Sequence, residues 1–327
     1  MNAKNHYSLT SNKVYKLAIT LLSKLPIIKE SMRAEIVTSV LVFAAAFRVS
    51  VNESCQILKS VPTSVTILNE LSETAIDIDK LEKKINKHFL TLLPKGLGRK
   101  GRRVAIDIVK TPYHGSVDEE HKDEVIRSQA YSGTTHFFAY ATAYVVLRGR
   151  RYTLALYRVR AGEKMEEVVS KIMRRLRLIA IKVSLLLLDR GFYSVAVIRY
   201  LINAHQPFIM PAVVRGKKAT STNEATGTRA LAALKSSCWQ TYTLKNADKE
   251  EVSFDMAVVC RNYNGRYKKH ARETWLYVTY GVKDKPLNWI KEAYRSRFGI
   301  ESSYRQLHQA RIKTTTRNPM LDRKSVV

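Results

Sequence analysis

The stretch LLLLDRGFYS, residues 185–194, decides the fold. Four consecutive leucines without polar alternation are typical of a short strand that is buried on both faces of a sheet. Asp189 ends this strand, and a glycine turn and a new apolar helix-like run from Ser194 follow it. Open α/β sheets place ligand and catalytic groups at this end of a strand. Asp189 is therefore the first candidate for a functional carboxylate.

The charge balance is the outstanding property of the composition. The 327 residues include 56 Lys and Arg against 28 Asp and Glu, a net charge of +28, while 45% hydrophobic residues indicate a globular chain. Such an excess favours a polyanionic partner, because neutralised phosphates release counterions. DNA is the expected partner; adaptation for solubility or ribosome binding is the alternative.

The three cysteines, Cys55, Cys238 and Cys260, are widely spaced and form no CxxC pair. This predicts neither a disulfide framework nor a thiolate zinc site. No apolar run approaches membrane-spanning length, and the first thirty residues lack a signal-peptide pattern. We expect a cytoplasmic protein that is not associated with a membrane.

Residues 1–93 are predicted to form a helical, DNA-binding domain. The apolar run 31–47, a capping box at Ser50 and Glu53, and a run after Pro62 indicate three short helices. They resemble a helix-turn-helix unit, although many small helical bundles share this pattern. Residues 77–93 add an amphipathic helix. The basic, glycine-rich segment 94–103 is interpreted as a flexible linker along phosphates.

A second aspartate, Asp107, lies inside the apolar strand 104–109 (VAIDIV). A carboxylate there is costly unless a metal ion or partner offsets it; a backbone-capping role is the alternative. Two strands, 134–147 and 152–159, and a helix, 164–178, lead to the Asp189 strand. This order predicts a mixed α/β sheet of the RNase H-like type, flanked by helices. In that fold the two aspartates are neighbours, although they lie 82 residues apart in sequence.

The predicted core comprises residues 104–215 and 283–317, interrupted by a β-rich insertion at 216–282. The insertion is basic, notably at Lys268 and Lys269. The predicted helix 286–310 returns to the core with four polar residues within an arc of about 60°, at 100° per residue. These are Tyr294, Arg297, Glu301 and His308.

Three carboxylates and a basic surface suit phosphodiester chemistry. Two Mg²⁺ or Mn²⁺ ions would activate the attacking oxygen and stabilise the leaving one, and such hard ions prefer carboxylate oxygens. Asp107, Asp189 and Glu301 are the catalytic and metal-binding candidates, with Asp107 between the ions. The DNA-contacting candidates are Tyr294, Arg297, His308, Arg190, Lys268 and Lys269.

The chain resembles DDE transposases of prokaryotic insertion sequences, of the family-four type and its archaeal relatives. The resemblance rests on the strand aspartate in AIDIV, the DRGFYS segment, the β-rich insertion and the signature Y-x2-R-x3-E-x6-K, here Tyr294, Arg297, Glu301 and His308. It implies metal-dependent cleavage of transposon ends and strand transfer into target DNA, by a homo-oligomer on DNA. Histidine replaces the signature lysine, so its charge depends on pH.

The short tail, residues 318–327, is a second departure, because family members continue with more apolar helical sequence. It predicts a truncated copy. Two alternatives to a transposase are a metal-dependent nuclease without strand transfer and an inactive, transposase-derived DNA-binding protein.

Overall fold

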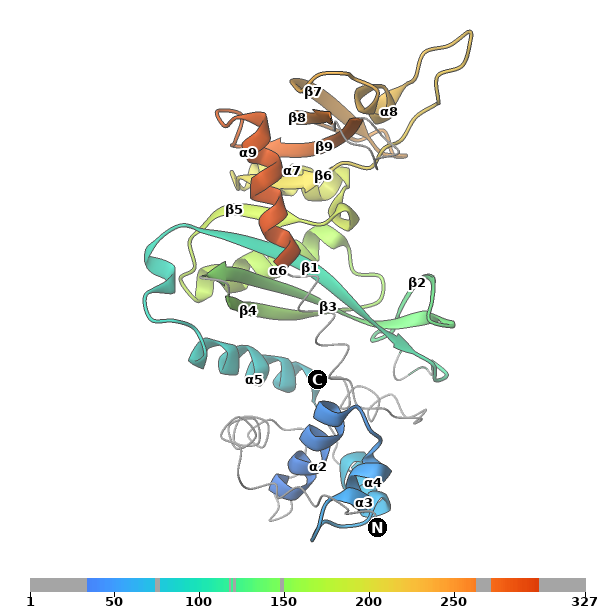
Figure 1. The fold of residues 1–327 in the computed structure, drawn as a ribbon, viewed down its shortest axis with the longest axis vertical. Coiled ribbons are helices and arrows are strands. Elements are labelled where there is room, and N and C mark those ends of the chain that lie inside the picture. Colours follow the sequence, from blue (N-terminus) through green and yellow to red (C-terminus); the bar gives the residue numbers. More distant parts are fainter. Residues whose placement is uncertain are drawn as a thin grey trace.

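The computed structural model describes residues 34–73, 77–117, 119, 122–147, 150–262 and 272–299 (Figure 1). Four N-terminal helices lie at one end, a large sheet occupies the centre, and the strands of residues 238–280 lie at the other end. Among the described residues, no helix is long and apolar enough to cross a membrane.

The N-terminal helices are α2 (Ala34–Phe47), α3 (Val51–Ile57), α4 (Ser64–Glu73) and α5 (Ile78–Thr91). They enclose a hydrophobic core of their own, which includes Val40, Ile67 and Leu81. The predicted capping box is confirmed, since Ser50 and Glu53 each accept a hydrogen bond from the other's backbone N–H. This region therefore folds as a small bundle beside the sheet.

Five strands form the centre of the sheet in the order β4-β3-β1-β5-β6. Their bounds are β1 (Arg102–Tyr113), β3 (Thr134–Leu147), β4 (Arg150–Val159), β5 (Val183–Leu188) and β6 (Phe208–Pro211). β5 runs parallel to β1 and β6, whereas β1 and β3, and β3 and β4, are antiparallel. This mixed order confirms the predicted RNase H-like α/β fold.

Helices cover both faces of the sheet. α6 (Met165–Leu178) and α7 (Val195–Asn203) share a hydrophobic core with Leu186 and Leu188. On the other face, α9 (Leu287–Arg295) shares a second hydrophobic core with Leu185 and Leu187. Successive side chains of a strand point to opposite faces, so all four leucines are buried, as their unbroken run predicts.

The predicted β-rich insertion continues the same sheet. β7 (Cys238–Lys245), β8 (Glu251–Asn262) and β9 (Arg272–Tyr280) form an antiparallel ladder. β9 then pairs with β6 of the core, with Met210 opposite Val278. The insertion is thus hydrogen-bonded to β6, and it shares hydrophobic cores with the strands β1 and β5, which lead to the aspartates.

Three local predictions are wrong. The strand predicted at 104–109 is too short, because β1 extends to Tyr113. The strand β2 (Ile126–Tyr131), which pairs with β3, has no counterpart among the predicted strands. The helix predicted over 286–310 does not continue as a regular α-helix, because α9 ends at Arg295 and a 3₁₀ turn, η3 (Ser296–Gly299), follows. A short helix, α8 (Gly227–Ala232), precedes the strands of the insertion.

The interpretation of residues 94–103 as a flexible linker is also wrong. Leu97 begins a 3₁₀ turn, η1 (Leu97–Arg99), and is buried in the core of the sheet. A Cβ atom on Gly98 would lie 2.3 Å from the carbonyl oxygen of Ala180. The glycines of this segment therefore permit close packing.

Candidate active site

The two aspartates lie at neighbouring positions of two parallel strands. Ile106 of β1 is paired with Leu188 of β5, so the next residues along the chain, Asp107 and Asp189, lie side by side. The Asp107 side chain is 14% exposed and the Asp189 side chain is 45% exposed. The parallel register therefore brings one buried and one accessible carboxylate together, as the fold predicts.

Arg297 of η3 contacts both carboxylates. Its Nη2 atom lies 3.2 Å from Oδ2 of Asp107 and 3.5 Å from Oδ1 of Asp189. Arg297 is itself 6% exposed. A single buried guanidinium thus provides positive charge between two carboxylates that would otherwise repel each other.

Burial raises the pKa of Asp107 above its ordinary value. The guanidinium of Arg297 and the backbone N–H of Ile108, which donates to Oδ1 at 2.9 Å, act in the opposite direction. The negative charge of Asp189 adds to the upward shift. Asp107 therefore occupies a site that disfavours additional negative charge and favours a further cation.

A cavity of about 770 Å³ opens beside Asp189. Five cationic side chains line it, and so do three aromatic ones. These are Arg190, Arg261, Lys291, Arg295, Arg297, Trp275, Tyr277 and Tyr294. Cationic groups suit phosphates, and aromatic faces suit nucleic-acid bases.

Helix α9 supplies much of this lining. The ammonium nitrogen of Lys291 lies 3.1 Å from the ring centroid of Trp275 on β9. Burial and then the neighbouring Arg261 lower the pKa of Lys291. One turn further along, Tyr294 packs against Tyr277, with ring centroids 5.3 Å apart and ring planes inclined by 50°. Burial raises the pKa of both phenols, that of Tyr277 to about 12. Aromatic packing therefore holds this end of α9 against the sheet.

The predicted DNA-contacting residues that the structure describes differ in their exposure. Arg190 is exposed beside Asp189, as expected of a phosphate contact. Tyr294 is buried, and Arg297 is turned onto the aspartates instead of lying on an open surface. Four predicted site residues, Glu301, His308, Lys268 and Lys269, lie outside the described residues.

Lys291, Trp275, Arg261 and Arg295 were missed by the sequence analysis. Lys291 precedes Tyr294 and Arg295 by three and four residues, the spacing that places side chains on one helix face, so this signal was present in the sequence. No local signal marks Trp275 or Arg261, because they reach the cavity only through the pairing of β8 with β9 and of β9 with β6.

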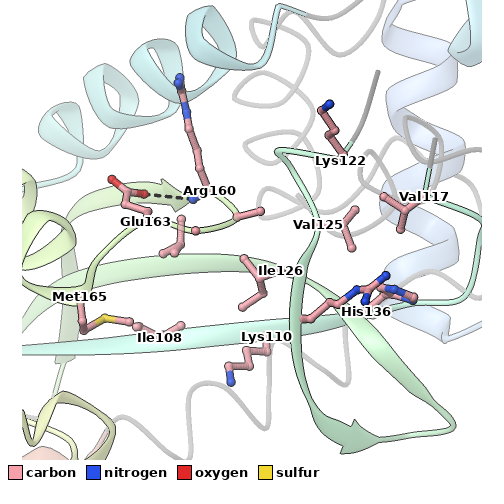
Figure 2. Close-up of a pocket in the computed structure, with 14 residues that line it drawn as sticks. Ile108, Lys110, Val117, Lys122, Val125, Ile126, His136, Arg160, Glu163 and Met165 are labelled. Carbon is pink, nitrogen blue, oxygen red and sulfur yellow. Dashed lines mark hydrogen bonds between the residues drawn. The ribbon is translucent and has the colours of Figure 1, made fainter. Parts of the chain in front are cut away.

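A second cavity, of about 600 Å³, lies on the opposite face of the sheet (Figure 2). Its wall includes Ile108, whose side chain points away from the face of Asp107 because neighbours on a strand alternate. Among the described residues that line the cavity, Glu163 is the one carboxylate, and it accepts hydrogen bonds from the backbone N–H of Arg160 at 3.0 Å and the Tyr157 hydroxyl at 2.6 Å. Glu163 is also paired with Lys171. Because this carboxylate is already engaged, the cavity does not resemble a metal site.

Within the described ranges, no group of three or more His, Cys, Asp and Glu side chains could hold a metal ion. The donor chemistry of the aspartate pair nevertheless fits a hard divalent cation, since both residues offer carboxylate oxygens. The position of the Arg297 guanidinium shows that the pair already attracts positive charge.

The sequence and the fold were compared with protein families, curated proteins and solved structures. The model of the family "Transposase DDE domain" matches residues 106–318, more than half of the chain. No curated protein matches the sequence significantly. Among solved structures, the fold is similar to a chain of the cryo-EM structure of the piggyBac transposase synaptic complex with hairpin DNA, with 8% identity and a TM-score of 0.48. The similarity covers 98% of this chain and 67% of that chain.

Proposed function

Because this chain belongs to the family of transposase DDE domains, we propose that it cuts DNA at the ends of a mobile element and joins the freed ends to target DNA. The observation that carries this proposal is the pair formed by Asp107 and Asp189, which adjacent parallel strands bring together against one guanidinium. A cationic and aromatic cavity beside the pair offers a place for the DNA strand.

DDE transposase domains generally depend on divalent metal ions. We infer that Asp107, Asp189 and Glu301 would hold two Mg²⁺ or Mn²⁺ ions, with Asp107 between them. When bound, such ions lower the pKa of the attacking water and stabilise the leaving oxygen. The protein's contribution is to hold Asp107 within β1 and Asp189 directly after β5, so that the pairing of these two parallel strands keeps the aspartates side by side.

Arg297 would keep the two aspartates together before a metal ion binds. Two neighbouring carboxylates repel each other, and Asp107 is largely removed from water, so a cation between them stabilises the empty site. Arg297 contacts the same carboxylate groups that would hold a metal ion, so the guanidinium would have to release them on metal binding. An arginine released in this way is well suited to bind a DNA phosphate through paired N–H donors.

The cavity beside Asp189 would then receive the DNA strand to be cut. Arg190, which is exposed, and Lys291, which lies over Trp275, both line this cavity and provide positive charge for phosphates. Binding the phosphates next to Asp189 would position the scissile bond without a base-specific contact. Transposition also requires two ends to be held together, so we propose that the protein acts as a homo-oligomer on DNA, at the nucleoid.

A nuclease without strand transfer is the second candidate, because the same carboxylates suit both reactions. The two functions differ in the fate of the freed 3′-hydroxyl. A transposase attaches it to a target duplex and produces a joined product that is longer than the substrate. A nuclease yields only shorter fragments. An inactive DNA-binding protein would bind DNA but form neither product.

A labelled duplex carrying the element's own terminal repeat, incubated with a second target duplex, tests the proposal. We expect cutting at the repeat boundary and joined products with Mg²⁺ or Mn²⁺, and neither with chelator. Asp189→Asn should abolish both, whereas Asp248→Asn, on the exposed turn between β7 and β8, should behave like the unmodified chain. Tight binding without metal-dependent cutting by the folded protein would overturn the proposal.

A further inference from the structure

Helix α5 carries a face of exposed lysines. Lys80, Lys83, Lys84 and Lys87, which we call the lysine face, are all exposed. Each residue of an α-helix is rotated by about 100° from the one before it, so the four side chains fall within an arc of about 100° of the helix surface. They also lie within two turns along the helix. They therefore present four ammonium groups to the same side.

The acidic residues of α5 point elsewhere. Asp79 pairs with Arg158 and Arg160 of the β4 region, at 3.0 Å and 3.1 Å. Glu82 is paired with Arg175 of α6 and accepts a hydrogen bond from the backbone N–H of Arg158 at 2.5 Å. Both carboxylates of the helix are thus committed to the catalytic core.

This separation of charge leaves most of the lysine face unneutralised. Lys80 pairs with Asp77 at 3.2 Å. Within the part of the chain that the structure describes, Lys83, Lys84 and Lys87 make no salt bridge. Surface helices stabilised for solubility usually intersperse charges of both signs and pair them three or four residues apart. A segregated, unpaired cationic face is instead typical of a surface that binds a polyanion.

The helix is fixed to the edge of the core sheet. Asn86 donates from Nδ2 to the carbonyl oxygen of Leu156 on β4 at 2.8 Å, and the Leu156 N–H donates to Oδ1 of Asn86, also at 2.8 Å. An amide side chain thus satisfies both backbone groups of an edge-strand residue, as another strand would. Figure 1 shows α5 beside β4, between the sheet and the remaining N-terminal helices. The lysine face is consequently held at a constant position relative to the aspartates.

Its distance from the aspartates suits a DNA duplex. β4 is two strands away from β1, which carries Asp107. Strand spacing and the width of a helix place the lysine face on the order of 20 Å from Asp107, or about six nucleotides along one DNA strand. A duplex in the active site could reach both.

The other described N-terminal helices do not offer such a surface. α2, α3 and α4 contain no lysine or arginine, and the exposed residues of α4 include Val65. As described, these three helices therefore carry no cationic side chain of their own, and the exposed cations beside them are Arg48, after α2, and Lys59, after α3. The positive charge of the described helical region is concentrated on α5.

We propose that the lysine face of α5 binds the phosphate backbone of duplex DNA, without sequence preference, and holds the DNA beside the cutting site. The identity of the partner rests on the proposed function. The contact itself is a separate site, on a different element from the aspartates. The segment after α5 adds three exposed cations, Lys95, Arg99 and Lys100.

The test uses the full-length chain and a duplex of random sequence, and measures the association constant over a range of KCl concentrations. Each phosphate contact contributes about 0.9 to the slope of log K against log salt. The triple variant Lys83→Gln, Lys84→Gln, Lys87→Gln should lower this slope by about 2 to 3 and weaken all sequences alike. Glutamine keeps the helix propensity close to that of lysine.

A matched variant removes the same net charge elsewhere: Lys182→Gln, Lys235→Gln, Lys249→Gln, at three exposed positions outside α5. Its slope should remain near that of the unmodified chain. Equal losses in the two triple variants, or no loss in the first, would overturn the proposal. If the first triple variant does not fold, as judged by its melting temperature, Lys84→Gln alone should lower the slope by about 0.9, and an unchanged slope would overturn it.

This test separates the lysine face from the aspartates. Asp189→Asn should leave the salt slope for random duplex unchanged while it abolishes cutting. The α5 variant should still cut the terminal repeat at low salt, because its aspartates are intact. Failure of one proposal can therefore be recognised while the other stands.

Discussion

Nη2 of Arg297 lies 3.2 Å from Oδ2 of Asp107, and both side chains are largely removed from water. Their contact joins the end of α9 to the middle of the sheet across 190 residues of sequence. Arg297 reaches Asp189 as well, so the helix that follows the insertion neutralises the carboxylates of two strands. Assembly of the candidate active site and docking of α9 are therefore one event.

Replacing Arg297 should destabilise the metal-free protein and increase its response to metal. Arg297→Gln leaves Asp107 buried beside Asp189 without a cation, and breaking a buried pair in this way costs about 3–5 kcal/mol. A divalent ion should restore much of this loss. Melting temperatures with chelator and with excess Mg²⁺ measure both effects.

Arg295→Gln is the matched control for this comparison. Arg295 lies two residues earlier and pairs with Glu292, and both side chains are 59% exposed. Surface pairs contribute little, so its melting temperature should remain close to that of the unmodified chain. A metal response in Arg297→Gln no larger than in Arg295→Gln would contradict the role of Arg297 as a competing cation.

Lys291→Gln should weaken DNA binding without affecting metal binding. Lys291 lines the cavity beside Asp189 and does not contact either aspartate. Loss of one charged hydrogen bond to a phosphate would raise the Kd about tenfold. Lys285→Gln, at an exposed lysine already paired with Asp284, serves as the control. Equal Kd values for the two variants would show that Lys291 does not contact DNA.

Asn86→Ala should weaken the packing of α5 against β4 and so lower the unfolding free energy of the protein. The substitution removes both hydrogen bonds to Leu156, and an unsatisfied backbone group costs about 1–3 kcal/mol. Urea unfolding measures the loss. Lys87→Ala, on the exposed side of the same helix, should change the stability by no more than about 0.5 kcal/mol. Equal unfolding free energies for the two variants would show that Asn86 does not hold α5 on the sheet.

The ionised carboxylate of Glu163 should stabilise the protein at neutral pH, and this stabilisation should be lost in acid. Burial alone would raise its pKa, but the hydrogen bonds from Lys171 and Tyr157 outweigh burial and hold the pKa below its usual value. A lowered pKa contributes stability that is present above the unfolded value of about 4.3 and is lost as the pH falls through the folded value. Glu163→Gln should therefore cost about 1–2 kcal/mol at neutral pH, since Lys171 is partly exposed, and progressively less as the pH falls below the unfolded pKa.

Unfolding free energies of Glu163→Gln and the unmodified chain, measured by urea across this pH range, check the prediction. Glu166→Gln, in the first turn of α6, is the control for loss of a carboxylate near the same helix end. A difference at Glu163 that persists unchanged into acid would show that packing, and not charge, is responsible.

Local patterns in the sequence determined the elements on which the site is built. The four leucines specified a strand buried on both faces, the Ser50 and Glu53 spacing specified a helix start, and the aspartates marked their strand positions, because each signal acts within a few residues of the chain. The order of strands and helices was sufficient to predict an RNase H-like sheet and the proximity of Asp107 to Asp189.

Tertiary structure alone decided the contacts that give these elements their function. The choice of Arg297 as the cation between the aspartates depends on where α9 ends, and the reach of Trp275 depends on β9 pairing with β6. Asn86 finds Leu156 seventy residues away. Such partners are selected by register and packing between distant segments, which no periodicity within one segment encodes.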